Sequence, residues 1–277
     1  MNLIIQGAEV HTQDLKQLAK LAQATRIERI TGQAFRLCDA TRTDGVAEFC
    51  QQAQLDYGLV PPQRRLADFG LLVMDMDSTL ITIECIDEIA DMLGLKAEVA
   101  AITAQAMRGE LDFAQSLRRR VALLNGLSES ALARVHDERL RLSPGAEKML
   151  ASMRSAGIKT LLVSGGFTFF TERLKARLGL DYALANTLAI ENGKLTGTVI
   201  GDIVDAQGKR AALERVRDEL GLTPGQVIAI GDGANDLEFM RAAGVSIAYH
   251  AKPVVRAQAS YALNYVGLDG VLNLLPA

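Results

Sequence analysis

Short, mostly apolar runs recur along the chain, and each is followed by polar residues and then by a helical pattern. The runs lie at residues 71–74, 158–163, 227–230, 245–248 and 262–266. Such a run, without polar alternation, is typical of a strand buried on both faces, as in a parallel sheet with helices on either side. Repeated strand-then-helix units with right-handed crossovers predict an α/β fold built on a doubly wound parallel sheet.

A tight hairpin is predicted within this pattern. Apolar residues at 184–190 and 195–200 flank Asn192-Gly193, and Asn-Gly between two apolar runs is a strong signal for a two-residue turn. We therefore expect two antiparallel strands at this point of the chain.

A long helical stretch interrupts the alternation of strands and helices. Residues 84–141 show helical periodicity throughout, broken at Gly94, Gly109 and Gly126. The chain therefore does not return directly to the sheet after its first strand. This pattern predicts a helical cap inserted into the core domain.

One arginine of this cap lies on an apolar helix face. Arg120 shares the i, i+3, i+4, i+7 face with Phe113 and Leu117, whereas Arg118 and Arg119 point elsewhere. The side chain could extend its charged end to water along apolar neighbours. Alternatively, a fixed guanidinium in a lid could bind a carboxylate or a phosphate.

Residues 1–66 are expected to form a separate, small α/β appendage of unknown role. Weakly patterned segments predict strands at 3–10 and 35–38 and helices at 14–23 and 46–54. Pro61-Pro62 then indicates a linker, because adjacent prolines stop both a helix and a strand ladder. The main domain is therefore placed at residues 67–277, with the cap inserted at about 84–141.

Charge and composition exclude several classes of function. A net charge of −3 without a basic cluster argues against nucleic acid or a membrane surface as a partner. No apolar run approaches the length of a bilayer span, and no signal peptide is apparent, so we expect a cytoplasmic protein. Cys38, Cys50 and Cys85 lack paired metal-ligand spacing, so reduced, buried thiols are expected.

The first strand ends in two carboxylates, Asp75 and Asp77. In an open α/β sheet the ligand crevice lies outside the carboxyl ends of the strands, where chemistry is expected. Residues two apart in an extended backbone point the same way, so both acids would face one volume and repel each other unless a cation lies between them. The pattern suggests a metal site, although ordinary capping residues at a strand-to-helix turn would look similar.

Polar residues also follow the next two strands. Ser164-Gly165-Gly166 precedes a helix and reads either as an anion cradle or as a plain Gly-rich turn. Asp232 follows the third strand, and Asp236 begins the next helix, where it could also serve as an N-cap.

Lys209 begins another predicted helix. A cation at a helix N-terminus opposes the macrodipole, so an anion such as a phosphate should lie nearby. The alternative is that Lys209 and Arg210 are simply solvated basic residues.

Taken in order, these residues resemble the motifs of the haloacid dehalogenase (HAD) superfamily. The motifs are Asp75-x-Asp77-x-Thr79, Ser164, Lys209 and Gly231-Asp232-Gly233-x-Asn235-Asp236, and they span about residues 68–277. Within the superfamily, the string from Asp75 to Ala90 is similar to the phosphoserine phosphatase family. The cap string Met107-x-Gly109-x-x-x-Phe113-x-x-Ser116-Leu117-x-x-Arg120 is also similar to that family.

The resemblance implies a HAD-like Rossmannoid core and a Mg²⁺-dependent phosphatase. In that family O-phospho-L-serine and water give serine and phosphate through an aspartyl-phosphate, in the last step of serine biosynthesis. It makes Asp75 the nucleophile and Asp77 the general acid and then base. It places Mg²⁺ on the carboxylates of Asp75 and Asp232 and on the backbone carbonyl of Asp77.

The resemblance also implies how the substrate is bound. The phosphoryl oxygens would be held by Ser164, the Gly165 amide, Lys209 and Asn235. Asp236 would orient Lys209 or a metal-bound water. A small zwitterion needs an acid for its ammonium and an arginine for its carboxylate, and these would be Glu84 and Arg120, with Met107 and Phe113 sealing the pocket.

Two other functions stay open. The phosphoryl group could pass from phosphoserine to another alcohol, such as homoserine, instead of water. A receiver-type signalling module also uses an aspartate at a strand end with a lysine and Mg²⁺, although Asp77 and the cap argue against a long-lived phosphoaspartate. The sequence also leaves open whether the protein forms a homo-oligomer.

Overall fold

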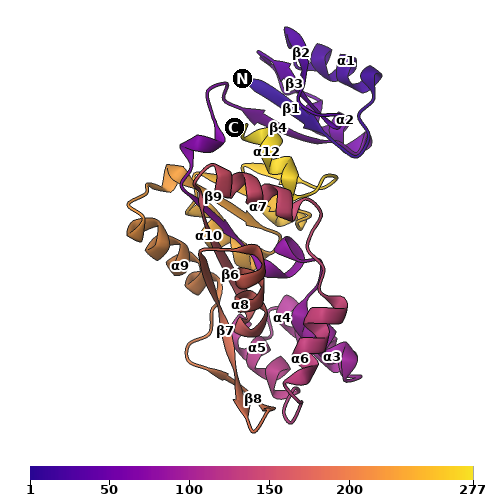
Figure 1. The fold of residues 1–277 in the computed structure, drawn as a ribbon. Coiled ribbons are helices and arrows are strands. Elements are labelled where there is room, and N and C mark those ends of the chain that lie inside the picture. The colour runs from indigo at the N-terminus through magenta and orange to yellow at the C-terminus, as the bar shows by residue number, and fades with distance from the viewer. Residues whose placement is uncertain (277) are drawn as a thin grey trace.

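The computed structural model describes residues 1–276, apart from the side chain of Met107. A large sheet with its helices forms the centre of the molecule. A small sheet built from the N-terminal residues lies at one end, and a group of cap helices and a hairpin lie at the other (Figure 1). No helix in this described part of the chain is long and apolar enough to cross a membrane.

The large sheet confirms the predicted α/β fold. Its strands follow the order β11-β10-β9-β5-β6-β7-β8, and all neighbours are parallel except β7 and β8. The strands are β5 (Leu71–Met74), β6 (Lys159–Phe167), β7 (Tyr182–Glu191), β8 (Lys194–Ile200), β9 (Val227–Gly231), β10 (Val245–Tyr249) and β11 (Tyr261–Leu263). The strand that ends at the predicted acids, β5, is therefore central, between β6 and β9.

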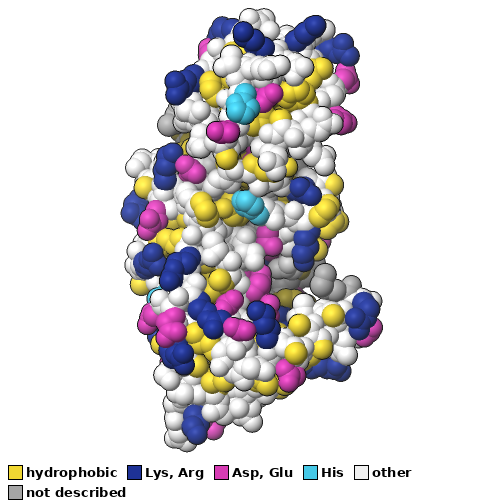
Figure 2. All heavy atoms as spheres, turned by 90° about the vertical axis from the view of Figure 1, so that its right-hand side faces the viewer, with side chains coloured by type: hydrophobic (Ala, Val, Ile, Leu, Met, Phe, Trp, Pro, Cys, Tyr) yellow, Lys and Arg dark blue, Asp and Glu magenta, His cyan; other side chains and the backbone are white. Residues whose placement is uncertain are grey.

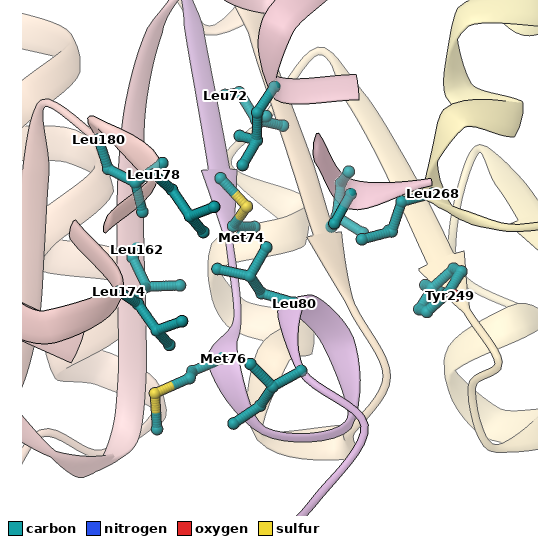
Figure 3. Close-up of a cluster of buried hydrophobic side chains, with 14 of the residues drawn as sticks. Leu72, Met74, Met76, Leu80, Leu162, Leu174, Leu178, Leu180, Tyr249 and Leu268 are labelled. Carbon is teal, nitrogen blue, oxygen red and sulfur yellow. The ribbon is translucent and has the colours of Figure 1, made fainter. Parts of the chain in front are cut away.

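Helices cover both faces of this sheet, as the apolar runs predict. Leu72 and Met74 of β5 face one core and Leu71 and Val73 the other, because successive side chains of a strand point to opposite faces. Figure 3 shows Leu72 and Met74 with side chains of neighbouring elements in the first core. The first core includes side chains of α7 (Ala146–Ser155), α8 (Thr168–Leu178) and α12 (Val271–Leu274). The second core includes side chains of α9 (Ala206–Glu219), α10 (Leu237–Arg241) and α11 (Pro253–Arg256).

The chain between β5 and α7 forms the helices of the cap. They are α3 (Cys85–Met92), α4 (Lys96–Met107), α5 (Phe113–Ala122) and α6 (Ser130–Arg134), followed by a helical turn at Val135–Arg139. Asp112 caps α5 by accepting a hydrogen bond from the Gln115 amide. An isolated bridge between Ile81 and Leu142 brings together the two chain segments that connect the cap to the core.

The hairpin formed by β7 and β8 confirms the prediction from Asn192-Gly193. Both residues have positive φ, 51° and 73°, as a two-residue turn of this kind requires. The hairpin is also joined to the cap through its backbone. Leu195 donates to the Leu127 carbonyl and accepts from the Gly126 amide, each at 2.8 Å.

The N-terminal residues form the strands and helices predicted for the appendage, together with two strands, β2 and β4, that the sequence does not predict. They fold as β1 (Asn2–Gln6), α1 (Thr12–Leu21), β2 (Arg26–Arg29), β3 (Ala34–Cys38), α2 (Val46–Gln52) and β4 (Asp56–Val60). The strands pair antiparallel in the order β2-β3-β1-β4. This is the βαββαβ pattern of ferredoxin-like units. Cys38, Cys50 and Cys85 are free and buried, as predicted.

Candidate active site

Asp75 and Asp77 lie at the carboxyl end of β5 and line one cavity of about 360 Å³. The Asp75 amide donates to the Ile230 carbonyl of β9, so the backbone stays in register with the sheet at this point. Met76 points away and is fully buried in the core (Figure 3). The chain then turns at Ser78, whose φ is 55°, and leads into the cap. The two acids therefore share one volume, as their spacing predicts.

Lys209 is buried beside these acids. Its Nζ lies 2.5 Å from Asp75 Oδ1 and 2.8 Å from Asp236 Oδ1, and the residue is 1% exposed. Burial would lower the pKa of Lys209, but the charges of Asp236 and Asp75 outweigh it and raise the pKa. The interpretation of Lys209 as a solvated basic residue is wrong. It fits only Arg210, which is exposed.

Asp236 holds Lys209 and the loop after β9 together. Its Oδ2 accepts from the Asp232 and Gly233 amides at 3.1 and 2.9 Å, while its Oδ1 accepts from Lys209 and from Asn235 Nδ2. Gly231 is needed beneath it, because a Cβ there would lie 2.6 Å from the Asp236 Cβ. Both oxygens of Asp236 are thus engaged by protein donors.

The carboxylates of Asp75, Asp232 and Asp236 could hold a metal ion, since their oxygens lie within 4.8 Å of one another. Burial and then the charge of Asp236 raise the pKa of Asp75 well above its usual range and that of Asp232 to about 6. Because Asp236 is engaged by its donors, Asp75 and Asp232 are the acids with oxygens to spare, and Thr79 Oγ1 fixes Asp232 at 3.1 Å. Such oxygen donors fit a hard divalent cation.

Asp77 contacts both the cap and the next strand. Its Oδ1 accepts from the Cys85 amide of α3 at 2.9 Å, and its Oδ2 accepts from Ser164 Oγ at 3.4 Å. Burial raises the pKa of Asp77. Ser164 also accepts from the Gly166 amide at 2.9 Å. The predicted turn at Ser164-Gly165-Gly166 proves to be the extended end of β6, which runs to Phe167 before α8 begins.

The cap contributes a second polar group of residues to the cavity. Arg120 lines it, and its Nε is buried without a hydrogen-bond partner among the described residues. Burial lowers the pKa of Arg120, and the charges of Asp87 and Glu84 offset only part of this lowering. Glu84 accepts from Ser78 Oγ at 2.7 Å, and although the residue is exposed at the rim, burial of its carboxyl group and the charge of Asp77 raise its pKa to about 7.

Phe113 and Met107 are the other two residues predicted to line the pocket. Phe113 lines the cavity, and its ring rests against Gly165, where a Cβ would come within 2.8 Å of Cζ. Gly165 therefore leaves room for the ring. The side chain of Met107 lies outside the described part of the structure.

Three polar residues that line the cavity were not predicted from the sequence. Asp87 and Thr103 line it from the cap, and Lys252 lines it from the loop after β10, where its amide donates to the Asp232 carbonyl at 3.3 Å. Asp87 reads as an ordinary acid in the first turn of a helix, and no motif surrounds Lys252. Figure 2 shows acidic side chains in the hollow between the cap and the core, with basic side chains beside them.

Two known protein families have sequence profiles that match parts of this chain. The sequence profile of haloacid dehalogenase-like hydrolases matches residues 72–241. This chain belongs to that family. The profile of a domain of unknown function, DUF4072, matches residues 3–45.

Relatives in this hydrolase family cover most of the chain. A phosphoserine phosphatase of Polaromonas sp. is 53% identical over 234 residues, which are 81% of this chain and 99% of the relative. That of Haemophilus influenzae is 49% identical over 83% of this chain and 73% of its own length.

Solved structures of the family share the whole fold. A HAD family hydrolase of Salmonella enterica serovar Typhi has a TM-score of 0.91 at 35% identity, over 99% of this chain and 98% of that one. A probable phosphoserine phosphatase of Vibrio cholerae has a TM-score of 0.87 at 39% identity, over 99% of this chain and 86% of that one.

Proposed function

We propose that this chain is a phosphoserine phosphatase, which hydrolyses O-phospho-L-serine to serine and phosphate. The relatives support this activity. One observation in the structure supports the choice of an amino-acid ester as the substrate. Arg120 lines the same cavity as Asp75 and Lys209, and its buried Nε has no hydrogen-bond partner among the described residues. One end of the cavity therefore suits a phosphoryl group and the other a carboxylate.

The reaction proceeds in two displacements at phosphorus. A carboxylate oxygen of Asp75 attacks the phosphorus, the bond to the serine oxygen breaks, and Asp77 donates its proton to that oxygen. An aspartyl-phosphate and serine result. Asp77 then takes a proton from water as the water attacks phosphorus, which releases phosphate and restores Asp75. A structure described as a phospho-aspartyl intermediate analogue of phosphoserine phosphatase is 38% identical, with a TM-score of 0.70, over 75% of this chain.

The electrostatics of the site suit both steps. The raised pKa of Asp77 is consistent with a role as proton donor to the leaving oxygen, and its contact with Ser164 supports a position beside the proposed phosphoryl site. We assign the phosphoryl oxygens to Ser164, the Gly165 amide, Lys209 and Asn235. Lys209 is held in place by Asp236.

Mg²⁺ is the ion that we propose for this site. The carboxylates of Asp75 and Asp232 and the backbone carbonyl of Asp77 would hold it, because it prefers oxygen ligands. When bound, it supplies positive charge to the phosphoryl oxygens.

The cap is assigned the recognition of serine. Arg120 would bind the substrate carboxylate and Glu84 its ammonium group, while Phe113 and Met107 would keep water out. We assign this activity to residues 67–277, with the cap at about 84–141, and leave residues 1–66 as an appendage.

A panel of small phosphoesters tests the proposal. Phosphoserine should be hydrolysed with the highest kcat/KM, phosphoethanolamine should lose the contribution of the carboxylate, and 3-phosphoglycerate that of the ammonium group. Asp75→Asn is the control for a contaminating phosphatase, since it should abolish turnover. Equal rates across the panel would contradict the substrate, and phosphohomoserine formed on adding homoserine would instead indicate a phosphotransferase.

A further inference from the structure

Asn186 is a buried polar residue on β7 that the reaction described above does not use. It is 1% exposed and does not belong to the described residues that line the active-site cavity. Its Nδ2 donates to the Gly165 carbonyl at 2.8 Å, and its Oδ1 accepts from the Val204 amide at 2.8 Å. Only this orientation of the amide satisfies both partners, because a carbonyl needs a donor and an amide N–H needs an acceptor.

The first of these bonds satisfies a backbone carbonyl at a point where the pairing of β6 and β7 is interrupted. β6 and β7 pair at Val163 with Leu184 and again at Phe167 with Asn186, with a register shift between the two pairs. Residues 164–166 of β6 therefore lie opposite a single residue of β7 and cannot all form ladder hydrogen bonds. Asn186 supplies the partner for the Gly165 carbonyl, so the bulged segment has a defined position.

The second bond fixes the start of the helix that carries Lys209. Val204 lies between β8 and α9, and it is followed by Asp205, the N-cap of α9, which accepts from the Gly208 amide at 2.8 Å. Lys209 stands in the first turn of this helix. The position of the Val204 backbone thus sets where α9 begins. It thereby also sets the position of the Lys209 backbone, from which the side chain extends to Asp75.

We infer that Asn186 is a positioning residue, whose side-chain amide sets the Gly165 amide and the Lys209 amine at the spacing that a phosphoryl group requires. The inference rests on the proposed function, in which these two groups hold the phosphoryl oxygens. One side chain therefore joins two phosphate-holding segments that are far apart in the sequence. Phosphate affinity should depend on Asn186, whereas serine affinity should not, because serine is bound by the cap.

Asn186→Asp tests this with almost no change of shape. The aspartate can still accept from Val204, but it turns an acceptor toward the Gly165 carbonyl and pushes that segment away. We expect kcat/KM for phosphoserine to fall about 10- to 100-fold, since displacements of about 1 Å can cost 10²-fold in rate. Calorimetry should show weaker binding of inorganic phosphate and unchanged binding of serine. Asn186→Ala, which adds no repulsion, should likewise weaken the binding of phosphate and leave the binding of serine unchanged.

Thr160→Val is the matched control. Thr160 is also buried, and its hydroxyl bridges β6 to the residue before β7 by donating to Asp181 Oδ2 and accepting from the Asp181 amide, both at 3.0 Å. This bridge lies at the opposite end of the strands, so its loss should lower Tm without changing phosphate affinity.

Several results would overturn the inference. The inference fails if phosphate affinity is unchanged in both Asn186 variants. It also fails if phosphate and serine affinity fall equally. A third contrary result is that both Asn186 variants fail to fold while Thr160→Val folds. The wild-type protein is assayed with phosphoserine in parallel. If it binds phosphate but does not hydrolyse phosphoserine, the proposed function fails, while the binding comparison still tests Asn186.

Discussion

The ring of Phe113, from the cap, rests against Gly165, from the core, so closely that a Cβ on Gly165 would lie 2.8 Å from Phe113 Cζ. Gly165→Ala should therefore push the cap away from the phosphoryl site while keeping the backbone amide. Overpacking of this kind costs about 1–3 kcal/mol, so we expect kcat/KM for phosphoserine to fall about 5- to 100-fold.

A double-mutant cycle separates this clash from other effects. Phe113→Leu should recover part of the activity of Gly165→Ala, because the smaller side chain makes room for the methyl group. Gly225→Ala is the control glycine substitution, since its Cβ would have no neighbour closer than 3.7 Å and should leave kcat/KM unchanged. Strict additivity of the Gly165 and Phe113 changes would contradict the contact.

Asp77→Asn should slow both displacements. An asparagine can still contact Ser164 but cannot transfer a proton, and a placed acid or base contributes roughly 10²–10⁴-fold. With p-nitrophenyl phosphate, whose leaving group needs no proton, stopped-flow absorbance should show a burst of nitrophenol followed by slow turnover. Wild-type turnover of phosphoserine by this variant would rule out Asp77 as the acid and base.

Ca²⁺ should inhibit the enzyme in competition with Mg²⁺. Calcium takes six to eight oxygen ligands at about 2.3–2.6 Å, against about 2.0–2.1 Å for magnesium, so it can draw both oxygens of Asp75 onto the metal. A nucleophile engaged in this way cannot attack phosphorus. Steady-state rates across mixtures of the two ions measure the effect, and full activity with Ca²⁺ alone would be inconsistent with the proposed ligands.

Asp232→Asn should stabilise the metal-free protein at high pH. Burial and the charge of Asp236 raise the pKa of Asp232 to about 6, above its ordinary value of 3.8. A raised pKa means that this group's contribution to stability is present below pH 4 and is lost as pH rises through about 6. The asparagine avoids this loss, which is on the order of 1–3 kcal/mol.

Thermal unfolding in EDTA at pH 5 and pH 8 measures this difference. The variant should gain stability over the wild type at pH 8 more than at pH 5, and added Mg²⁺ should raise the Tm of the wild type only. A variant that Mg²⁺ stabilises as much as the wild type would show that Asp232 is not a ligand.

The sequence predicts the centre of this fold because its strands are marked by continuous apolar runs. It also predicts that the ends of β5, β6 and β9 meet, because the carboxyl ends of parallel strands lie at one edge of a sheet, and Asp75, Gly165 and Asp232 do line one cavity. Both inferences depend on local patterns combined with a general rule of topology.

The missed elements depend on contacts that no local pattern reveals. β2 carries a single apolar residue, Ile27, which is 40% exposed, so only the ladder with β3 identifies it as a strand. β4 has Gly58 at its centre, which reads as a break, although a Cβ there would collide with Tyr261 and Leu274. Asn186 is missed for the same reason, since its partners lie on other segments.

Arg120→Ala tests the central claim most directly, because Arg120 distinguishes a phosphatase for an amino-acid ester from a general one. Hydrogen bonds to a charged group are worth about 1.5–3 kcal/mol, so kcat/KM for phosphoserine should fall about ten- to a few hundred-fold. For p-nitrophenyl phosphate, which has no carboxylate, the loss should be small. Arg118→Ala, which removes an exposed arginine from the same helix, should change neither value. The measurement is kcat/KM for both substrates in each variant, with Tm as a control on folding. A fall confined to phosphoserine is the result the account predicts; an equal fall on both substrates, or none on phosphoserine, would contradict it.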